Sequence, residues 1–162
     1  MKKTLTIITV SVGMFFMGCG DGEKKTTDPY EKKAPTEQKK EVSSVPASER
    51  VDLTNKGIGP IKNVEIGETI DMEMAAKGEE VYNMNCTACH KVDKKFIGPA
   101  PKGILERRTP EWVMNMILNP EEMTQKDPLA HDLLLEYNGS PMANQNMSEE
   151  QARQMVEYFR TL

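Results

Sequence analysis

The chain has 162 residues, of which 38% are hydrophobic and 28% charged, and its formal net charge at pH 7 is −4. This length allows one modest globular domain with a small core. Residues 51–162, which have a globular composition, include 12 Lys and Arg and 18 Asp and Glu, giving a formal charge of −6. This acidic balance argues against nucleic-acid binding.

The N-terminus has the composition of an export signal. Lys2 and Lys3 precede an apolar stretch over residues 5–17, and Gly18 precedes Cys19. We therefore predict a signal peptide over residues 1–18. Its end is similar to the lipobox of bacterial lipoproteins, which implies lipid attachment at Cys19; ordinary cleavage with an incidental Cys is the alternative. No later stretch approaches the roughly 18 apolar residues of a transmembrane helix.

Residues 19–50 are predicted to form the lipidated N-terminus and a disordered linker. Lys, Glu, Thr, Ser and Pro dominate, and Tyr30 is the only aromatic side chain between residues 20 and 50. Such a stretch cannot bury enough apolar surface to offset the entropy lost on ordering. Its root-mean-square reach of about 30 Å suits a domain that moves between partners on one membrane surface.

Residues 51–162 are predicted to form one all-α domain. Residues 51–70 have the pattern of extended chain, and the residues after them predict helices over 73–85, 110–118 and 128–137, and a last helix from residue 149. No sheet is expected. The expected N-caps are Thr109, Asp127 and Ser148, with Gln151 completing a capping box and Met147 as a hydrophobic staple.

Cys86-Thr87-Ala88-Cys89-His90 is a Cys-x-x-Cys-His motif, the attachment site of a c-type haem. The two thiols add across the two vinyl groups of the porphyrin, and the two residues between them set the span of the loop. His90 then lies under the iron and can bind it through the imidazole. The motif therefore predicts one covalently bound haem c.

Two other uses of a Cys-x-x-Cys pair are less consistent with the chain. A zinc site needs two more ligands at compatible spacing, and only His131 is left to supply one. A thioredoxin-like dithiol requires alternating strands and helices around the motif, which the sequence lacks. The third cysteine, Cys19, belongs to the export signal, so no structural disulfide is expected.

The domain resembles a class I cytochrome c in more than this motif. Gly78, Tyr82 and Cys86 have the spacing of the family's N-terminal helix, and Met-Val-Glu-Tyr-Phe at residues 155–159 is similar to its aromatic C-terminal helix. The resemblance implies a small cytochrome c fold, in which these two helices cross and the helices wrap around one covalent haem.

The same resemblance implies the ligands of the iron. Gly98-Pro99 is similar to the family's Gly-Pro, whose Pro carbonyl accepts a hydrogen bond from the ligand histidine, here His90. The sixth ligand in the family is a Met on a loop before the last helix. Met142 has that position and is the predicted ligand, with Met147 and His131 as the alternatives.

The resemblance also implies an electron carrier rather than an enzyme, with iron cycling between ferric and ferrous states while both axial ligands stay bound. We expect a lipid-anchored monomer on the periplasmic side of a bacterial membrane. Its expected redox protein partners are a donor and a respiratory terminal reductase or oxidase. The alternatives are a peroxidase-like haem enzyme or a gas or redox sensor with a labile sixth ligand, and a structural lipoprotein with a redox dithiol.

Charged residues are distributed unevenly along the domain. The segment after the haem motif is basic, whereas residues 121–136 are mainly acidic. We expect the basic segment to steer an acidic redox partner toward the haem edge. Its bases are Lys91, Lys94, Lys95, Lys102, Arg107 and Arg108.

Overall fold

The computed structural model describes residues 44–162; the predicted signal peptide, Cys19 and the linker up to residue 43 lie outside that range. The described chain is helical, with no strand and one isolated bridge, between Asp52 and Arg108. No helix within it has the length and apolar composition needed to cross a membrane. The elements are α1 (Met72–Asn85), the 3-10 turn η1 (Ile104–Glu106), α2 (Pro110–Leu118), α3 (Pro120–Lys126), α4 (Pro128–Glu136) and α5 (Glu149–Phe159).

The helices begin where capping chemistry predicts. The side chains of Thr109 and Asp127 each accept a hydrogen bond from the backbone N–H three residues further on. Ser148 and Gln151 form the complete capping box at the start of α5. Each side chain satisfies a donor that the first helical turn leaves unpaired, so local chemistry decides these starts.

Helix α3 is an element that the sequence analysis does not predict. Pro120 ends α2 because it cannot continue the backbone hydrogen bonding, and it also occupies the first position of α3. Met123 is the only large apolar side chain of this helix, so no helical period is visible in the sequence. Met123 is fully buried and its sulfur accepts a hydrogen bond from Ile58 N–H at 2.9 Å. Tertiary packing therefore stabilises α3.

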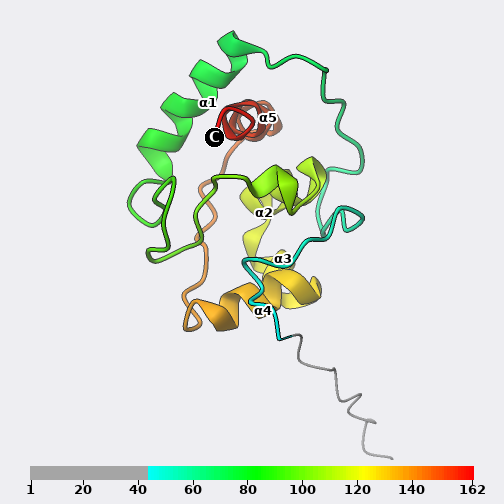
Figure 1. The fold of residues 1–162 in the computed structure, drawn as a ribbon, viewed down its shortest axis with the longest axis vertical. Helices are drawn as coiled ribbons and strands as arrows, with labels where there is room; N and C mark the ends of the chain where they lie inside the picture. The colour runs from blue at the N-terminus through cyan, green and yellow to red at the C-terminus, as the bar shows by residue number, and fades with distance from the viewer. Residues whose placement is uncertain (1–43) are drawn as a thin grey trace, which may run out of the picture. The chain divides into compact units, whose positions relative to one another are not determined.

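Helices α1 and α5 cross at one end of the domain, with α2 in the middle and α3 and α4 at the other end (Figure 1). The crossing is close because residue 78 is glycine: a Cβ there would lie 2.1 Å from the carbonyl oxygen of Gln154. Next to it, the rings of Tyr82, Tyr158 and Phe159 pack with centroids 5.5–5.9 Å apart. The predicted crossing of the first and last helices is confirmed.

Residues 46–70 run over the helices as an N-terminal strap, and residues 51–70 are non-helical, as the sequence predicts. Side chains of the helices hold its backbone. Asn115 of α2 is fully buried, donates to the carbonyls of Lys56 and Ile61, and accepts from the Ile61 N–H. These bonds replace the ladder of a sheet, because they satisfy buried backbone groups that have no strand partner.

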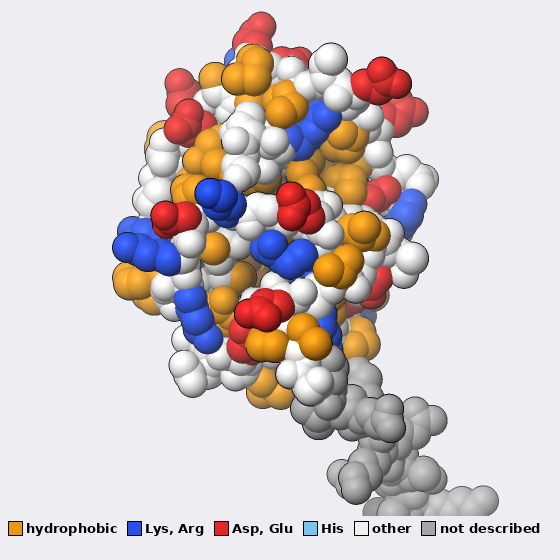
Figure 2. Space-filling view, viewed as in Figure 1, with side chains coloured by type: hydrophobic (Ala, Val, Ile, Leu, Met, Phe, Trp, Pro, Cys, Tyr) orange, Lys and Arg blue, Asp and Glu red, His pale blue; other side chains and the backbone are white. Residues whose placement is uncertain are grey.

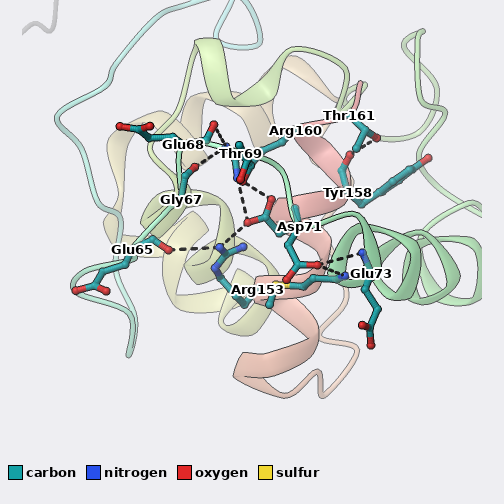
Figure 3. Close-up of polar contacts among 12 residues, drawn as sticks. Glu65, Gly67, Glu68, Thr69, Asp71, Glu73, Arg153, Tyr158, Arg160 and Thr161 are labelled. Atoms are coloured by element: carbon teal, nitrogen blue, oxygen red, sulfur yellow. Dashed lines mark hydrogen bonds and ion pairs between the residues drawn. The ribbon is translucent and has the colours of Figure 1, made fainter.

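Helix α5 and its C-cap residue hold the end of the strap through two arginines, Arg153 and Arg160, on either side of a buried carboxylate. Glu157 lies 2.6 Å from Arg153 Nη2 and 2.8 Å from Arg160 Nη1. Both arginines also donate to backbone carbonyls of residues 65–69 (Figure 3). The paired charges satisfy Glu157 and orient the two guanidinium groups. The strap leads from there to Asp71, the N-cap of α1.

The packed part of the chain begins ahead of the predicted boundary at Val51. Ala47 is buried, and its carbonyl accepts a hydrogen bond from Arg108 at 2.6 Å. Arg50 forms an ion pair with Asp132 of α4 at 2.8 Å. Residues 47–50 have the same polar composition as the predicted linker, so only contacts with distant helices distinguish them from it.

Candidate haem-binding site

The Cys-x-x-Cys-His motif forms a tight turn directly after α1. The N–H groups of Cys89 and His90 both donate to the carbonyl oxygen of Cys86, at 3.0 and 2.8 Å. Both cysteines are free thiols, Cys86 half-buried and Cys89 exposed. The turn therefore brings the two thiols and the imidazole together, with the thiols available for thioether bonds.

The ionisation of Cys86 does not suit a redox dithiol. Burial, followed by the neighbouring Cys89, raises the pKa of the Cys86 thiol to about 11. The thiol is therefore protonated at neutral pH, whereas a thioredoxin-like cysteine needs a lowered pKa to act as a nucleophile. This argues against the structural lipoprotein with a redox dithiol.

The imidazole of His90 is oriented by the Pro99 carbonyl. Nδ1 of His90 lies 2.7 Å from the Pro99 oxygen, so Nδ1 carries the proton and donates. In the neutral imidazole this leaves the lone pair on the other ring nitrogen, Nε2, as the one that can bind a metal. The contact that the sequence analysis expects between these two residues is present, and it makes His90 a more basic ligand.

Gly98 leaves the space that the His90 ring occupies. A Cβ at residue 98 would lie 2.4 Å from Cε1 and 2.8 Å from Nδ1 of His90, closer than nonbonded atoms can approach. The Gly98 N–H donates to the Cys89 carbonyl at 2.9 Å, which fixes the loop beside the ring. The Gly-Pro pair signals a turn in the sequence, but the contact of Gly98 with the imidazole is visible only in the structure.

The three candidate sixth ligands differ in their environment. Met142 and Met147 lie on the segment between α4 and α5, and both are half-buried against the core. His131 is on α4 with an exposed side chain, and its Nδ1 lies 3.1 Å from the Thr124 carbonyl. Met142 and His131 line one cavity of about 510 Å³ between α3, α4 and the loop that carries Met142. In the described chain, no hydrogen bond joins Met142 to the His90 turn.

The residues present fit a covalently attached haem. The donor set consists of two thiols, an imidazole with a free Nε2 and a thioether, which are the groups that attach and ligate haem c. Apolar side chains between His90 and Met142 in the chain remain incompletely buried, as expected if a large apolar group covers them. They are Val92, Ile104, Leu105, Met116 and Leu118.

Arg108 does not belong to the predicted basic docking surface. Its side chain is only 2% exposed, donates to the carbonyls of Ala47, Arg50 and Arg107, and lies over the Trp112 ring. Burial lowers the pKa of Arg108 to about 10, so it stays charged at neutral pH. It anchors the strap and is not available to a partner.

The other bases of that segment differ from one another in their contacts, which the sequence does not indicate. Lys91 donates to the Thr87 carbonyl at 2.8 Å, and Lys95 lies 4.4 Å from the centre of the Tyr137 ring. Lys94 is exposed and has no hydrogen bond or ion pair within residues 44–162. Figure 2 shows Lys and Arg interspersed with Asp and Glu on one face, without a large patch of a single sign.

The sequence model of the cytochrome c family matches residues 75–162. The solved structure of cytochrome c from Rhodothermus marinus is 44% identical over 72% of this chain and 92% of that chain, with a TM-score of 0.62. An engineered cytochrome c from Rhodothermus marinus, bound to a carbene intermediate, is 43% identical over 72% and 93% of the two chains, with a TM-score of 0.60. No curated protein matches the chain.

The matched range includes Cys86, Cys89, His90, Pro99 and Met142. The structural similarity extends over most of the length of the Rhodothermus marinus cytochrome c, and the sequence identity of 44% is far higher than a shared fold alone would require. Because the match covers the whole candidate site and the donor set fits the cofactor, the chain belongs to the cytochrome c family and carries one covalently bound haem c.

Proposed function

We propose that the protein is a lipid-anchored carrier of single electrons on the periplasmic side of a bacterial membrane, which passes electrons to a respiratory terminal reductase or oxidase. Membership of the cytochrome c family supports the carrier role. The observation that carries it is the fixed orientation of His90, whose Nδ1 donates to Pro99 at 2.7 Å. A carrier needs ligands that keep their positions in both oxidation states, because preorganised groups need no rearrangement at the moment of transfer.

Each residue of the site has a role in such a carrier. Haem c supplies one-electron redox chemistry at its iron. Cys86 and Cys89 would hold the macrocycle covalently, and His90 and Met142 would bind its iron. A thioether ligand favours the reduced state more than a second imidazole does, so Met142 would raise the potential.

The proposed docking surface lies on the loop that follows the haem motif. It consists of the exposed Lys94, Lys95 and Lys102 with Phe96 and Ile97, which are 49% and 48% exposed. Aromatic and aliphatic groups with charges at their edge are typical of the centre and rim of an interface. The lysines would steer an acidic partner, and the apolar groups would complete a short-lived contact.

The location rests on the export signal and on Cys19. If Cys19 carries the lipid, Cys19→Ser should move the protein from the membrane fraction to the periplasmic extract with its haem intact. Gly18→Ala is the matched control, because it changes the neighbouring position but keeps a small residue before Cys19, and this variant should stay with the membrane. Membrane retention of cleaved Cys19→Ser protein would contradict the anchor.

A second candidate function is a haem enzyme or sensor with a labile sixth ligand. The cavity beside Met142 favours it, because a ligand that borders open space can move aside. An engineered cytochrome c from Rhodothermus marinus, 43% identical to this chain, has been solved bound to a carbene intermediate. We rank this function second, because the acid and the base that line this cavity, Glu121 and His131, form no hydrogen bond to the Cys86–His90 turn within residues 44–162.

The two functions differ in spectra and turnover. A carrier should show a reversible one-electron titration and, when ferric, the weak near-infrared band of a Met–iron bond. It should oxidise a peroxidase dye with hydrogen peroxide no faster than the same amount of a carrier of known low peroxidase activity. Absence of the near-infrared band together with rapid peroxide turnover would reject the carrier and favour the enzyme.

A further inference from the structure

The segment that carries Met142 has few polar contacts with the rest of the domain. We name residues 138–147 the Met142 loop. Within residues 44–162, the only hydrogen bonds of positions 141–147 are internal: Gln145 donates to the Ala143 carbonyl and Asn146 N–H to the Asn144 side chain. The loop also contains no Asp, Glu, Lys or Arg, so no ion pair can hold it. The strap, by contrast, is bonded to helices along most of its length.

Side-chain packing restrains the Met142 loop only partly. Pro141 and residues 143–146 are exposed, and Met142 itself borders the cavity of about 510 Å³. Segments with few buried contacts and few hydrogen bonds open more easily than the rest of a fold. The position of Met142 therefore depends on how the two ends of the loop are fastened.

The C-terminal end of the loop is fastened by local chemistry. Met147 packs against the core, and Ser148 begins α5 with a capping box. At the N-terminal end, the N–H groups of Asn138 and Gly139 donate to α4 carbonyls at 3.1 and 2.8 Å. Packing at this end comes from Tyr137, which is 6% exposed and whose backbone carbonyl accepts from Ser140 N–H at 3.1 Å. Tyr137 is thus the last well-packed residue before Met142.

Lys95 makes the contact that joins this end of the loop to the His90 side of the site. Its Nζ lies 4.4 Å from the centre of the Tyr137 ring, a cation–π distance. Lys95 belongs to the loop that follows the His90 turn, whereas Tyr137 precedes Met142. The pair therefore connects the two segments that carry the predicted axial ligands.

We propose that Lys95 and Tyr137 are positioning residues for Met142. The cation–π contact fastens the start of the Met142 loop and limits how often the thioether leaves the iron. This inference rests on the proposed function, with Met142 as the sixth ligand. An exposed cation–π contact changes an equilibrium by about two- to five-fold, which is the expected increase in the open population when the contact is lost.

Imidazole, which competes with the thioether for ferric iron, is the probe of this opening. Full-length holoprotein would be titrated with imidazole while the near-infrared Met–iron band is followed. Lys95→Met should raise the apparent imidazole affinity about two- to five-fold. Lys94→Met removes the same charge from the neighbouring exposed residue, which has no ring contact, and should leave the affinity unchanged. Lys95→Arg retains a cation for the ring and should restore the original affinity.

Variants of the ring separate packing from the hydroxyl. Tyr137→Phe keeps the ring and should have the imidazole affinity of the unmodified protein. Tyr137→Leu removes the ring and should raise the affinity as much as Lys95→Met does. The double variant Tyr137→Leu with Lys95→Met should raise it little further. Hydrogen exchange of residues 138–147 should accelerate in Lys95→Met and not in Lys94→Met. Equal imidazole affinities for Lys95→Met and Lys94→Met would overturn the proposal.

Failure of the ligand assignment has a different signature. Met142→Ala should abolish the near-infrared band while covalent haem remains. If it does not, Met142 is not the ligand and the proposed function must be revised. If Met142→Ala abolishes the band but the Lys95 variants leave imidazole affinity unchanged, only the positioning role is wrong.

Discussion

Replacing Gly98 by alanine puts one methyl group into the space of the His90 ring. A Cβ at residue 98 would lie 2.4 Å from Cε1 of His90, whereas nonbonded carbon atoms prefer about 3.5–4.0 Å. The imidazole or the loop must therefore move by about 1 Å. Such a movement would stretch the 2.7 Å contact between Nδ1 and the Pro99 oxygen beyond hydrogen-bonding distance.

Two effects of Gly98→Ala should be measurable on the holoprotein. Overpacking should lower the free energy of unfolding by about 1–3 kcal/mol. Loss of the Nδ1 hydrogen bond makes the imidazole a weaker electron donor, which favours ferrous iron. A difference of about 0.5 kcal/mol between the two oxidation states would raise the potential by about 20 mV, since about 1.4 kcal/mol corresponds to 59 mV for a one-electron couple.

Denaturant titration and a spectroscopic redox titration test these effects. Gly67→Ala is the matched control, because a Cβ there would meet only the Thr69 carbonyl, at an ordinary 3.6 Å. The control should change stability by no more than about 0.5 kcal/mol and should leave the potential unchanged. A Gly98→Ala protein with the stability and potential of the control would refute the argument that this glycine exists to accommodate the imidazole.

Other changes test other parts of the site. Arg108→Met should lower the free energy of unfolding by about 1–3 kcal/mol, because it leaves the Ala47 and Arg50 carbonyls without their donor. Denaturant titration measures this loss. An altered haem spectrum would count against a purely structural role of Arg108. Cys89→Ala should leave at most one thioether bond, visible as a shifted pyridine haemochrome band. Complete removal of haem from the unmodified protein by acid–acetone would contradict covalent attachment. Lys94→Glu with Lys102→Glu should slow electron transfer to an acidic partner several-fold at low salt, and less as the Debye length falls from about 30 to 8 Å between about 0.01 and 0.15 M ionic strength. Lys62→Glu, outside the docking surface, is the control in that assay, and an equal slowing by it would show that only net charge matters.

The attachment chemistry and the helix starts could be predicted from the sequence because each depends on residues close together in the chain. The Cys-x-x-Cys-His run contains both thiols and the imidazole within five positions. Thr109, Asp127 and Ser148 bond to N–H groups three residues away, so their effect is independent of the rest of the fold. The family resemblance added the partner of His90, which lies nine residues further along the chain.

The remaining features depend on residues that only folding brings together. The bases after the haem motif look alike in the sequence, yet Arg108 is buried under the strap, Lys95 lies over Tyr137 and Lys94 is free of such contacts in the described chain. Helix α3 shows no apolar period in the sequence, since the burial of a single side chain, Met123, against the strap is what stabilises it. Hydrogen bonds and ring contacts across 40 or more residues leave no local pattern, because composition records which groups are present and not which groups meet. The sequence by itself thus determined the cofactor and how it is attached, whereas the tertiary structure decided which side chains hold the ligands in place and which remain available to a partner.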